Sequence, residues 1–519
     1  MFEELAEVDD AALIAVIDDA ARNEAREAAR RLAAIAELAD RRCASELGLA
    51  REHWACDGFD AAAAEVAAAL SIGHRAALGQ LHQGLALRHR LPKVATLLAD
   101  GRITARTATA ATWRTGLIED PDVLALLDTD LAAAATRFGP LSAAKLDAKL
   151  DALIFQHDPA AVRQYQGVAR GCDIGFGDRE DLTGTRSIWG RLQVTDAELL
   201  ARRLQAMERQ VCPDDPRLAG ERRSQAMGVL AAGGTTLACR CGKPDCPAAG
   251  RDARADAITI TVLVDHMPGS DDADGGGPDD EPGPPGGPGD EPTTPKPPPA
   301  EPPTEAEPEN PSPDTQVPRT TASPAVIAGG GIVPTPLLTE LVAMGATIKH
   351  IDACTDPEPG YRPSRRLRRY VRTRDMTCRF PGCNHPAEYA DLDHTIAYGT
   401  GLTHPGNLKA LCRKHHLLKT FWTGTGGWAD RQHPDGTIEW TSPTGHTYHV
   451  PPGSRLHFPN WNTTTPTPTN TPSGPRAPTP ERGLTMPTRT RTRRQQHTYA
   501  ITTERTRNQA YLDANPPPF

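Results

Sequence analysis

The sequence lacks any apolar run long enough to cross a bilayer, and its acidic first ten residues contain no basic segment. The first absence argues against a transmembrane helix, and the second against a secretory signal. The eleven cysteines fall in spacings suited to metal ligands and so do not require an oxidising compartment. These features predict a cytoplasmic protein without a membrane partner. Nothing in the sequence indicates an oligomeric state.

The chain has no overall excess of positive charge, since 66 Asp/Glu outnumber 57 Lys/Arg and the formal net charge is −9 at pH 7. That value argues against a nucleic-acid partner only until the charge is divided along the chain. Residues 361–420 hold twelve Lys/Arg and four Asp/Glu, a local net charge of +8, whereas residues 267–320 hold thirteen acids and two bases. A basic segment of this kind can bind phosphates by releasing counterions.

Two close pairs of soft ligands lie in the basic segment. Cys378 and Cys383 flank Arg-Phe-Pro-Gly, whose Pro-Gly predicts a tight turn that brings the sulfurs together. Cys412 and His415 are three residues apart in a run from Asn407 onward that we expect to be helical, which places both on one face. Four ligands in two such pairs are typical of a structural zinc site.

Between and beside these pairs lie groups suited to a harder cation. Asp393 offers a carboxylate oxygen, and His394 an imidazole that can accept a proton near neutral pH. His416 is rotated by roughly 100° from its helical neighbour, so we expect it to hold a catalytic cation together with Asp393. Asn407 could either fix the tautomer of His394 or ligate that cation. Adjacent strand residues face opposite sides, so Asp393 and His394 need a bend or a strand end to serve one site.

The order His394, Asn407, His416 resembles the HNH endonuclease family. The phrases Cys-Arg-Phe-Pro-Gly-Cys and Leu-Cys-Arg-x-His-His-x-Leu-Lys-Thr are similar to those of actinobacterial HNH proteins with a long helical N-terminal domain of unknown function. The resemblance implies a ββα-metal fold in which one catalytic divalent metal (Mg, Mn, Ni or Zn) lies beside one structural zinc. In one departure, the Asp-His is followed by Thr395-Ile-Ala-Tyr-Gly where related motifs often contain proline.

An arginine cluster precedes the zinc ligands, and a solvated helix surface is its alternative interpretation. Beside a nuclease motif we expect it to contact phosphates and to form the DNA-binding face: Arg362, Arg365, Arg366, Arg368, Arg369, Arg372 and Arg374. Further arginines in the C-terminal tail could add non-specific affinity: Arg489, Arg491, Arg493 and Arg494. The partner is expected to be double-stranded DNA, which predicts association with the nucleoid.

The predicted fold class is α+β and multidomain, with a mainly helical N-terminal region, a mixed middle and a C-terminal zinc-stabilised nuclease domain. The expected divisions are a helical to mixed domain (1–266), a disordered acidic Pro/Gly-rich linker inserted into it (267–324), the return of that domain (325–360), the HNH domain with a small β-extension (361–452) and a disordered Thr/Pro/Arg-rich tail (453–519).

Three further cysteines, Cys239, Cys241 and Cys246, lie between two predicted strands, Arg186–Val194 and Ile258–Val264. They could form another zinc site, although no fourth ligand is evident; reduced surface thiols or a different redox role are the alternatives. Taken together, the motifs predict a metal-dependent DNA endonuclease. A zinc-stabilised DNA-binding or mobile-element-derived protein without nuclease activity is the alternative.

Overall fold

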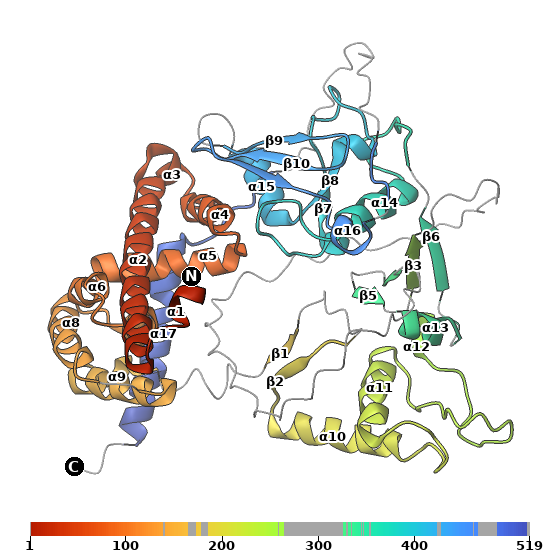
Figure 1. Cartoon of the computed structure of the whole chain (residues 1–519), viewed down its shortest axis with the longest axis horizontal. Helices are drawn as coiled ribbons and strands as arrows, with labels where there is room; N and C mark the ends of the chain where they lie inside the picture. Colours follow the sequence, from red (N-terminus) through yellow and green to blue (C-terminus); the bar gives the residue numbers. More distant parts are fainter. Residues whose placement is uncertain are drawn as a thin grey trace.

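The computed structural model describes residues 2–138, 141–163, 173–177, 185–257, 259–263, 325–422, 427–459, 461–465 and 485–515, apart from short gaps at 328–330, 334, 344, 346 and 352–353. The chain is a mixed α+β protein in which a helical bundle lies beside several small sheets (Figure 1). The linker predicted for residues 267–324 lies outside the described residues.

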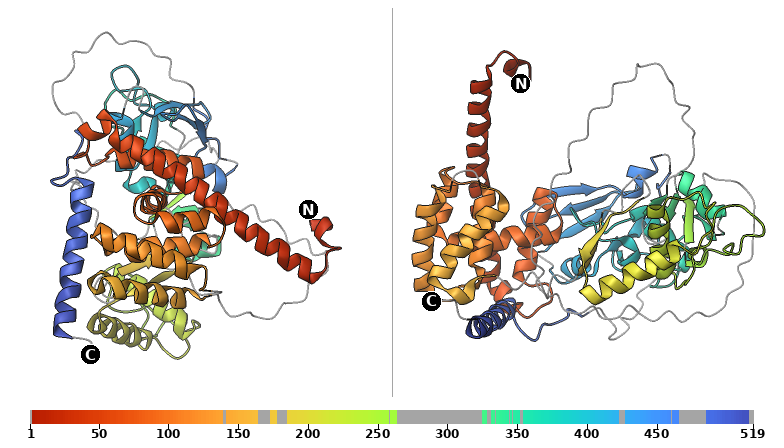
Figure 2. Two further views of the ribbon diagram at one scale, coloured as in Figure 1. Left: turned by 90° about the vertical axis from the view of Figure 1, so that its left-hand side faces the viewer. Right: turned by 90° about the horizontal axis from the view of Figure 1, so that it is seen from below.

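The N-terminal third forms the bundle. Its elements are α1 (Phe2–Leu5), α2 (Asp10–Ala44), α3 (Glu46–Ala50), α4 (Gly58–Leu70), α5 (His74–His89), α6 (Pro92–Ala99), α7 (Ala105–Arg114), α8 (Pro121–Ala135) and α9 (Ala143–His157), with short 3₁₀ turns at Thr115–Leu117 and Pro159–Ala161. Only the second half of α2 packs on the bundle, because its buried side chains begin at Ala25 whereas Ile14 and Ile17 are exposed. The first half of α2 projects from the bundle (Figure 2).

The middle of the chain combines a hairpin, helices and a sheet. Strands β1 (Asp173–Phe176) and β2 (Ile188–Arg191) pair antiparallel and precede α10 (Val194–Glu208), α11 (Ala219–Ala231) and α12 (Arg254–Ala257). A four-stranded sheet of order β5-β4-β3-β6 follows, made of β3 (Thr259–Leu263), β4 (Ala325–Ile327), β5 (Gly331–Val333) and β6 (Thr347–Ile351), with α13 (Thr335–Ala343) before β6. Strand β3 pairs with β4 and β6, so strands from both sides of residues 264–324 share one sheet.

The region that carries the paired-ligand motif is built around a second hairpin. Its elements are α14 (Arg365–Asp375), β7 (Asp391–His394), β8 (Leu408–Leu411), α15 (Arg413–Phe421), β9 (Ala429–Gln432), β10 (Ile438–Thr441), β11 (Thr447–Val450) and α16 (Ser454–His457), with 3₁₀ turns at Ala387–Tyr389 and Pro405–Asn407. The helix expected from Asn407 onward instead begins at Arg413. The preceding residues pair with β7 as a fully buried strand, and this packing overrides their helical spacing.

The C-terminal segment corrects another expectation. A disordered tail from residue 453 is wrong for Arg493–Ala514, which form the 22-residue helix α17 along the bundle (Figure 2). Thr492 and Gln495 form a capping box at its start. Further along, Arg505 pairs with Asp158 at 2.6 Å, and the Asn508 amide donates to two backbone carbonyls of the bundle. These polar contacts stabilise a helix that has no apolar stripe to reveal it.

Candidate metal centre

The four predicted soft ligands converge on one point. The ligand atoms of Cys378, Cys383, Cys412 and His415 all lie within 4.8 Å of one another. His415 Nδ1 is 3.5 Å from the Cys378 sulfur and 3.3 Å from the Cys412 sulfur. Cys412 caps α15, and His415 lies in its first turn. This is the donor set and the closed arrangement that a structural zinc requires.

The loop that carries Cys378 and Cys383 is fixed by its backbone. The Cys378 N–H donates to the His385 carbonyl at 2.7 Å, and the His385 N–H donates to the Cys383 sulfur. Gly382 has φ +73, and a Cβ there would lie 2.5 Å from the Ile72 carbonyl oxygen. The turn and the close approach of the bundle therefore both require glycine at this position.

The electrostatics of the cluster fit a cation. The neighbouring Cys378, Cys383 and His415 side chains hold the pKa of Cys412 below its usual value, whereas burial raises the pKa of Cys378. His415 presents Nδ1 to the sulfurs, and its ring stacks on Phe380 with centroids 4.0 Å apart. Three sulfurs, those of buried Cys378 and Cys412 and of half-buried Cys383, lie beside the His415 nitrogen, and a bound Zn²⁺ would balance the charge of the thiolates.

His416 points to a different set of groups, as the helical rotation predicts. Its Nδ1 lies 2.9 Å from Asp391 Oδ2, and its Nε2 lies 3.5 Å from Asp393 Oδ1. A carboxylate on one ring nitrogen orients the other toward a metal. The sequence interpretation assigned no role to Asp391. The signal was present, because residues two apart on a strand share a face and Asp391 therefore lies beside Asp393.

Asp393 is held ionised by two lysines. Its Oδ2 lies 2.7 Å from Lys409 Nζ and 2.5 Å from Lys419 Nζ, while Lys409 also pairs with Asp430 at 2.6 Å. Burial favours the neutral acid, but the two ammonium groups outweigh it and lower the pKa of Asp393 to about 2. Both lysines contact Oδ2, so Oδ1 remains directed toward His416. Asp393 Oδ1 and His416 Nε2 thus form a two-donor pair suited to a divalent cation.

His394 ends β7 beside this pair. Its Nε2 lies 2.9 Å from Thr403 Oγ1, and its ring stacks on Tyr361 with centroids 5.4 Å apart. Burial lowers the pKa of His394 to about 4, against the opposing effect of Asp393. The imidazole is therefore neutral at physiological pH and able to accept a proton.

The contacts of Asn407 fit neither of the two roles considered for it. Its side-chain oxygen accepts from the Ile396 N–H, and its amide donates to the carbonyls of Ile396 and Leu402. These bonds brace the loop between β7 and the following 3₁₀ turn. The hydrogen bonds of Asn407 thus fix the loop after His394 and involve neither the imidazole nor the Asp393–His416 pair.

The arginines of the predicted DNA-binding face differ in how deeply they are buried. Arg362, Arg365 and Arg366 are exposed, and Arg368, Arg369 and Arg372 are half-buried. Arg374 is fully buried; it pairs with Asp375 at 2.8 Å and donates to the carbonyls of Pro405 and Leu408. The phosphate contact expected for Arg374 is therefore wrong, because its donors serve the backbone that precedes β8.

Two arginines of the C-terminal segment also form ion pairs within the protein. Arg489 and Arg493 pair with Asp57 and Asp60 at the start of α4. Asp60 additionally pairs with Lys414 of α15 at 3.1 Å. Phosphate binding by Arg489 and Arg493 is thus not supported, and the same two carboxylates join the bundle, α15 and the C-terminal segment.

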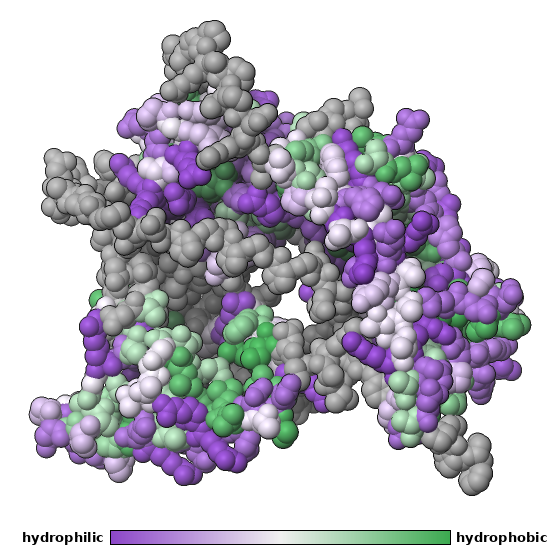
Figure 3. All heavy atoms as spheres, turned by 180° about the vertical axis from the view of Figure 1, so that it is seen from behind, coloured by the Kyte–Doolittle hydropathy of each residue, from purple (hydrophilic) through white to green (hydrophobic). Residues whose placement is uncertain are grey.

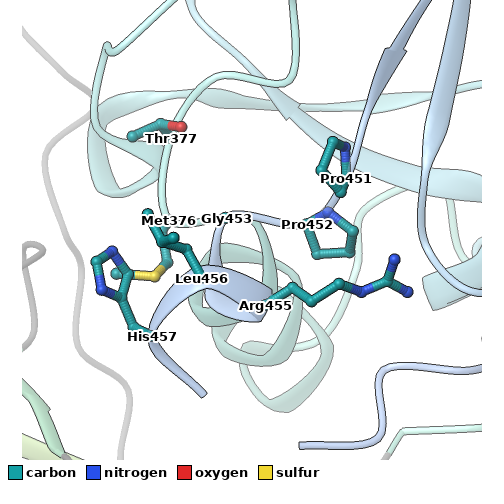
Figure 4. A pocket seen from close by; sticks show the side chains of 8 residues that line it. All are labelled: Met376, Thr377, Pro451, Pro452, Gly453, Arg455, Leu456 and His457. Carbon is teal, nitrogen blue, oxygen red and sulfur yellow. The ribbon is translucent and has the colours of Figure 1, made fainter. Parts of the chain in front are cut away.

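A pocket of about 450 Å³ lies between the end of α14 and α16 (Figure 4). Its lining residues are Met376, Thr377, Pro451, Pro452, Gly453, Arg455, Leu456 and His457. None of the ligands described above lines it, so the pocket is separate from the metal centre.

Comparison with known proteins assigns the chain to a family. Residues 19–283 match the model of a domain of unknown function, DUF222. The chain belongs to the DUF222 family. It is 49% identical over 521 residues to the uncharacterized protein Rv2100 of Mycobacterium tuberculosis, in an alignment that spans 99% of this chain and 91% of that protein. It is 48% identical over 465 residues to the uncharacterized protein Rv3776 of the same organism, in an alignment that spans 89% and 83%. No solved structure matches the chain.

The DUF222 match contains a second cysteine cluster and ends before Cys378. Cys212 joins Cys239, Cys241 and Cys246, with all four sulfurs within 4.8 Å of one another. The fourth ligand was missed because Cys212 precedes the first of the others, Cys239, by 27 residues and α11 lies between them. None of the helices in the described part of this DUF222 protein combines the length and the apolar character needed to span a bilayer.

Proposed function

We propose that the chain is a metal-dependent DNA endonuclease of the HNH type. The observation that carries the proposal is the Asp393–His416 donor pair with a neutral His394 beside it, presented by β7 and α15. Two antiparallel strands followed by a helix agree with the ββα-metal arrangement that the resemblance implies. The family also agrees, because the HNH proteins that the sequence resembles carry a helical N-terminal domain of unknown function.

Each residue has a role that follows from its contacts. Thr403 engages His394 Nε2, which leaves Nδ1 to accept the proton of the attacking water. Asp393 Oδ1 and His416 Nε2 would hold the divalent cation, with Asp391 orienting His416. When bound, that cation would stabilise charge on the phosphate and on the leaving oxygen. Asn407 holds the loop that positions His394, and the four zinc ligands hold the frame.

The DNA would lie along the start of α14. Arg365 and Arg366 are exposed there, in a segment whose net charge is positive while the chain as a whole is acidic. Phosphate contacts of this kind bind duplex DNA without reading its sequence. An enzyme with such a face would associate with the nucleoid.

One observation favours a DNA-binding protein without nuclease activity. Lys409 and Lys419 both contact Asp393, and a carboxylate neutralised by two ammonium groups attracts a cation less strongly. The two candidates differ in a single measurable property, hydrolysis of the DNA backbone.

The test is cleavage of supercoiled plasmid by the full chain across Mg²⁺, Mn²⁺, Ni²⁺ and Zn²⁺, with a chelator control. His394→Ala should lower the cleavage rate by about 10²–10⁴-fold, which is typical for loss of a general base. DNA affinity should be unchanged, and His433→Ala, a half-buried histidine outside the centre, should cleave like the parent protein. Binding without cleavage under every metal would favour the alternative, whereas equal cleavage rates for the parent and His394→Ala would show that His394 is not the general base.

A further inference from the structure

The second cysteine cluster belongs to a part of the molecule that the proposed nuclease does not use. Cys212 follows α10, and the other three cysteines follow α11. The sulfurs of Cys212 and Cys239 are 3.5 Å apart, and all four cysteines are free rather than joined in disulfides. Four sulfurs converging on one point provide a tetrahedral all-thiolate site, which suits zinc or iron.

Backbone N–H groups around these cysteines donate hydrogen bonds to the sulfurs. The N–H of Asp214 donates to Cys212, that of Lys243 to Cys241, and that of Ala248 to Cys246. Each donor is two residues after its cysteine, as in the Cys383 loop, where His385 is the donor. Gly242, with φ +72, allows the chain to turn between Cys241 and Lys243. Hydrogen bonds from N–H groups stabilise the charged form of a thiol, which is the form that binds metals.

A buried ion pair holds the two cysteine loops together. Asp215 pairs with Arg217 at 2.7 Å and accepts from the Arg240 N–H at 2.9 Å, while Arg217 donates to the Ala238 carbonyl. Asp215 lies three residues after Cys212. The Arg240 N–H that donates to it and the Ala238 carbonyl that accepts from Arg217 belong to the two residues next to Cys239. The loops are therefore held in register next to the sulfurs, which lowers the entropy cost of assembling four ligands.

The surrounding apolar core is thin. The core of α10, α11 and the cysteine loops contains five buried residues: Met207, Val211, Ala226, Val229 and Leu237. Large apolar side chains of the same module remain exposed, including Val194 at 82%, Leu199 at 66% and Leu218 at 73%. Figure 3 shows hydrophobic atoms at the surface where α10 and α11 lie. A module with so small a core commonly needs a staple such as a structural metal.

We infer that Cys212, Cys239, Cys241 and Cys246 bind one structural zinc ion that orders residues 194–257. All four coordination positions come from the chain, so no position is open for a substrate. Four thiolates around Zn²⁺ leave a net charge of −2, which the backbone N–H donors to the sulfurs partly offset. The inference does not depend on nuclease activity, since none of these residues belongs to the Asp393–His416 centre.

Zinc counting on the full chain, purified without added metal, tests the site. Parent protein should contain two zinc ions, one for each four-ligand cluster, after passage over a weak chelator that clears the surface group His433, Glu439 and His449. Cys239→Ser should lose one of the two, and Cys43→Ser, a half-buried cysteine outside both clusters, should lose none. Unchanged zinc content in Cys239→Ser would overturn the inference, and stoichiometric iron in place of zinc would overturn the choice of metal.

A second measurement uses only the parent protein, so it does not depend on a variant that folds. Thiol alkylation followed by peptide mass spectrometry should show Cys212, Cys239, Cys241 and Cys246 protected until a strong chelator is added. Equal labelling with and without chelator would contradict a bound metal. Disulfides among these cysteines under reducing purification would contradict it as well. Plasmid cleavage is scored separately, so failure of the zinc inference and failure of the nuclease proposal remain distinguishable.

Discussion

Cys378, Cys412 and His415 are buried in the contact between α15 and the helical bundle, whereas all four cysteines of the second cluster are half-buried in loops. Around the first cluster, Phe380, Trp428 and Trp440 form an aromatic core, and alanines of α4 pack against it. Around the second, an ion pair and five buried side chains provide the support. Similar ligand chemistry is therefore embedded in two different surroundings, and loss of metal should have different consequences in the two regions.

The largest expected effect separates the clusters directly. Cys412→Ser should release zinc worth on the order of 10 kcal/mol or more of folding free energy and expose residues 376–422 together with the α4 surface that packs on them. Cys239→Ser should expose residues 194–257 and leave the bundle and α15 protected. Hydrogen exchange read by mass spectrometry checks both variants. The same exchange pattern in the two variants would show that the clusters do not stabilise separate regions.

Next in size is the buried carboxylate that ties the first cluster to the rest of the molecule. Asp60 is fully buried and pairs with Lys414, Arg489 and Arg493. Asp60→Asn leaves Lys414 without this carboxylate and leaves Arg489 and Arg493 with Asp57 alone. The change should cost about 3–5 kcal/mol in chemical denaturation. Asp10→Asn, at an exposed position on α2, is the matched control. A destabilisation as small as that of the control would mean that the bundle and α15 do not depend on these ion pairs.

The same carboxylate predicts a pH dependence. The hydrogen bond with His74 and the cations around Asp60 together outweigh its burial and hold its pKa far below the usual value. A depressed folded-state pKa contributes stability that is present above the unfolded value of about 3.9 and is lost as pH falls below it. Parent protein should lose stability on acidification below about pH 4 more steeply than Asp60→Asn. Parallel acid limbs of the two curves would contradict the assignment.

Sequence spacing identified the first cluster because its ligands form two short-range pairs. It also predicted that His416 faces away from His415, because a helix places consecutive residues on different faces, and His416 does face Asp393. Cys212 was missed because its partners follow an intervening helix. Arg374 and Arg493 resembled phosphate ligands because partners distant in the sequence hold them: the carbonyls of Pro405 and Leu408 bind Arg374, and the Asp57 carboxylate binds Arg493. The helix α17 was missed for a related reason: its docking bonds join residues more than 340 positions apart. Local patterns reveal ligands and strands, whereas polar interactions between distant segments appear only in three dimensions.

A smaller effect concerns the harder cation beside the first cluster. Asp391→Asn removes the carboxylate that orients His416. It should lower the affinity for the catalytic cation by about 10–100-fold, without loss of either zinc. Activity should then recover as divalent metal is raised, and the metal titration of plasmid cleavage measures the shift. Zinc content measured on the same sample provides the control. An unchanged metal titration would mean that Asp391 does not support the cation.

The smallest expected effect tests whether only the module with the buried cluster binds DNA. Replacing Arg365 and Arg366 by Ala should lower affinity and reduce the slope of log affinity against log salt by about 0.9 for each phosphate that is no longer neutralised. Arg202 and Arg203 form a matched pair of adjacent exposed arginines on α10, in the module with the half-buried cluster. Their replacement by Ala should leave both affinity and slope unchanged, because that module is expected to bind no phosphate. Duplex binding measured across a salt series compares the two double variants. If the α10 pair lowers the slope as much as the α14 pair, DNA lies across both modules, and the assignment of the DNA face to α14 alone is wrong.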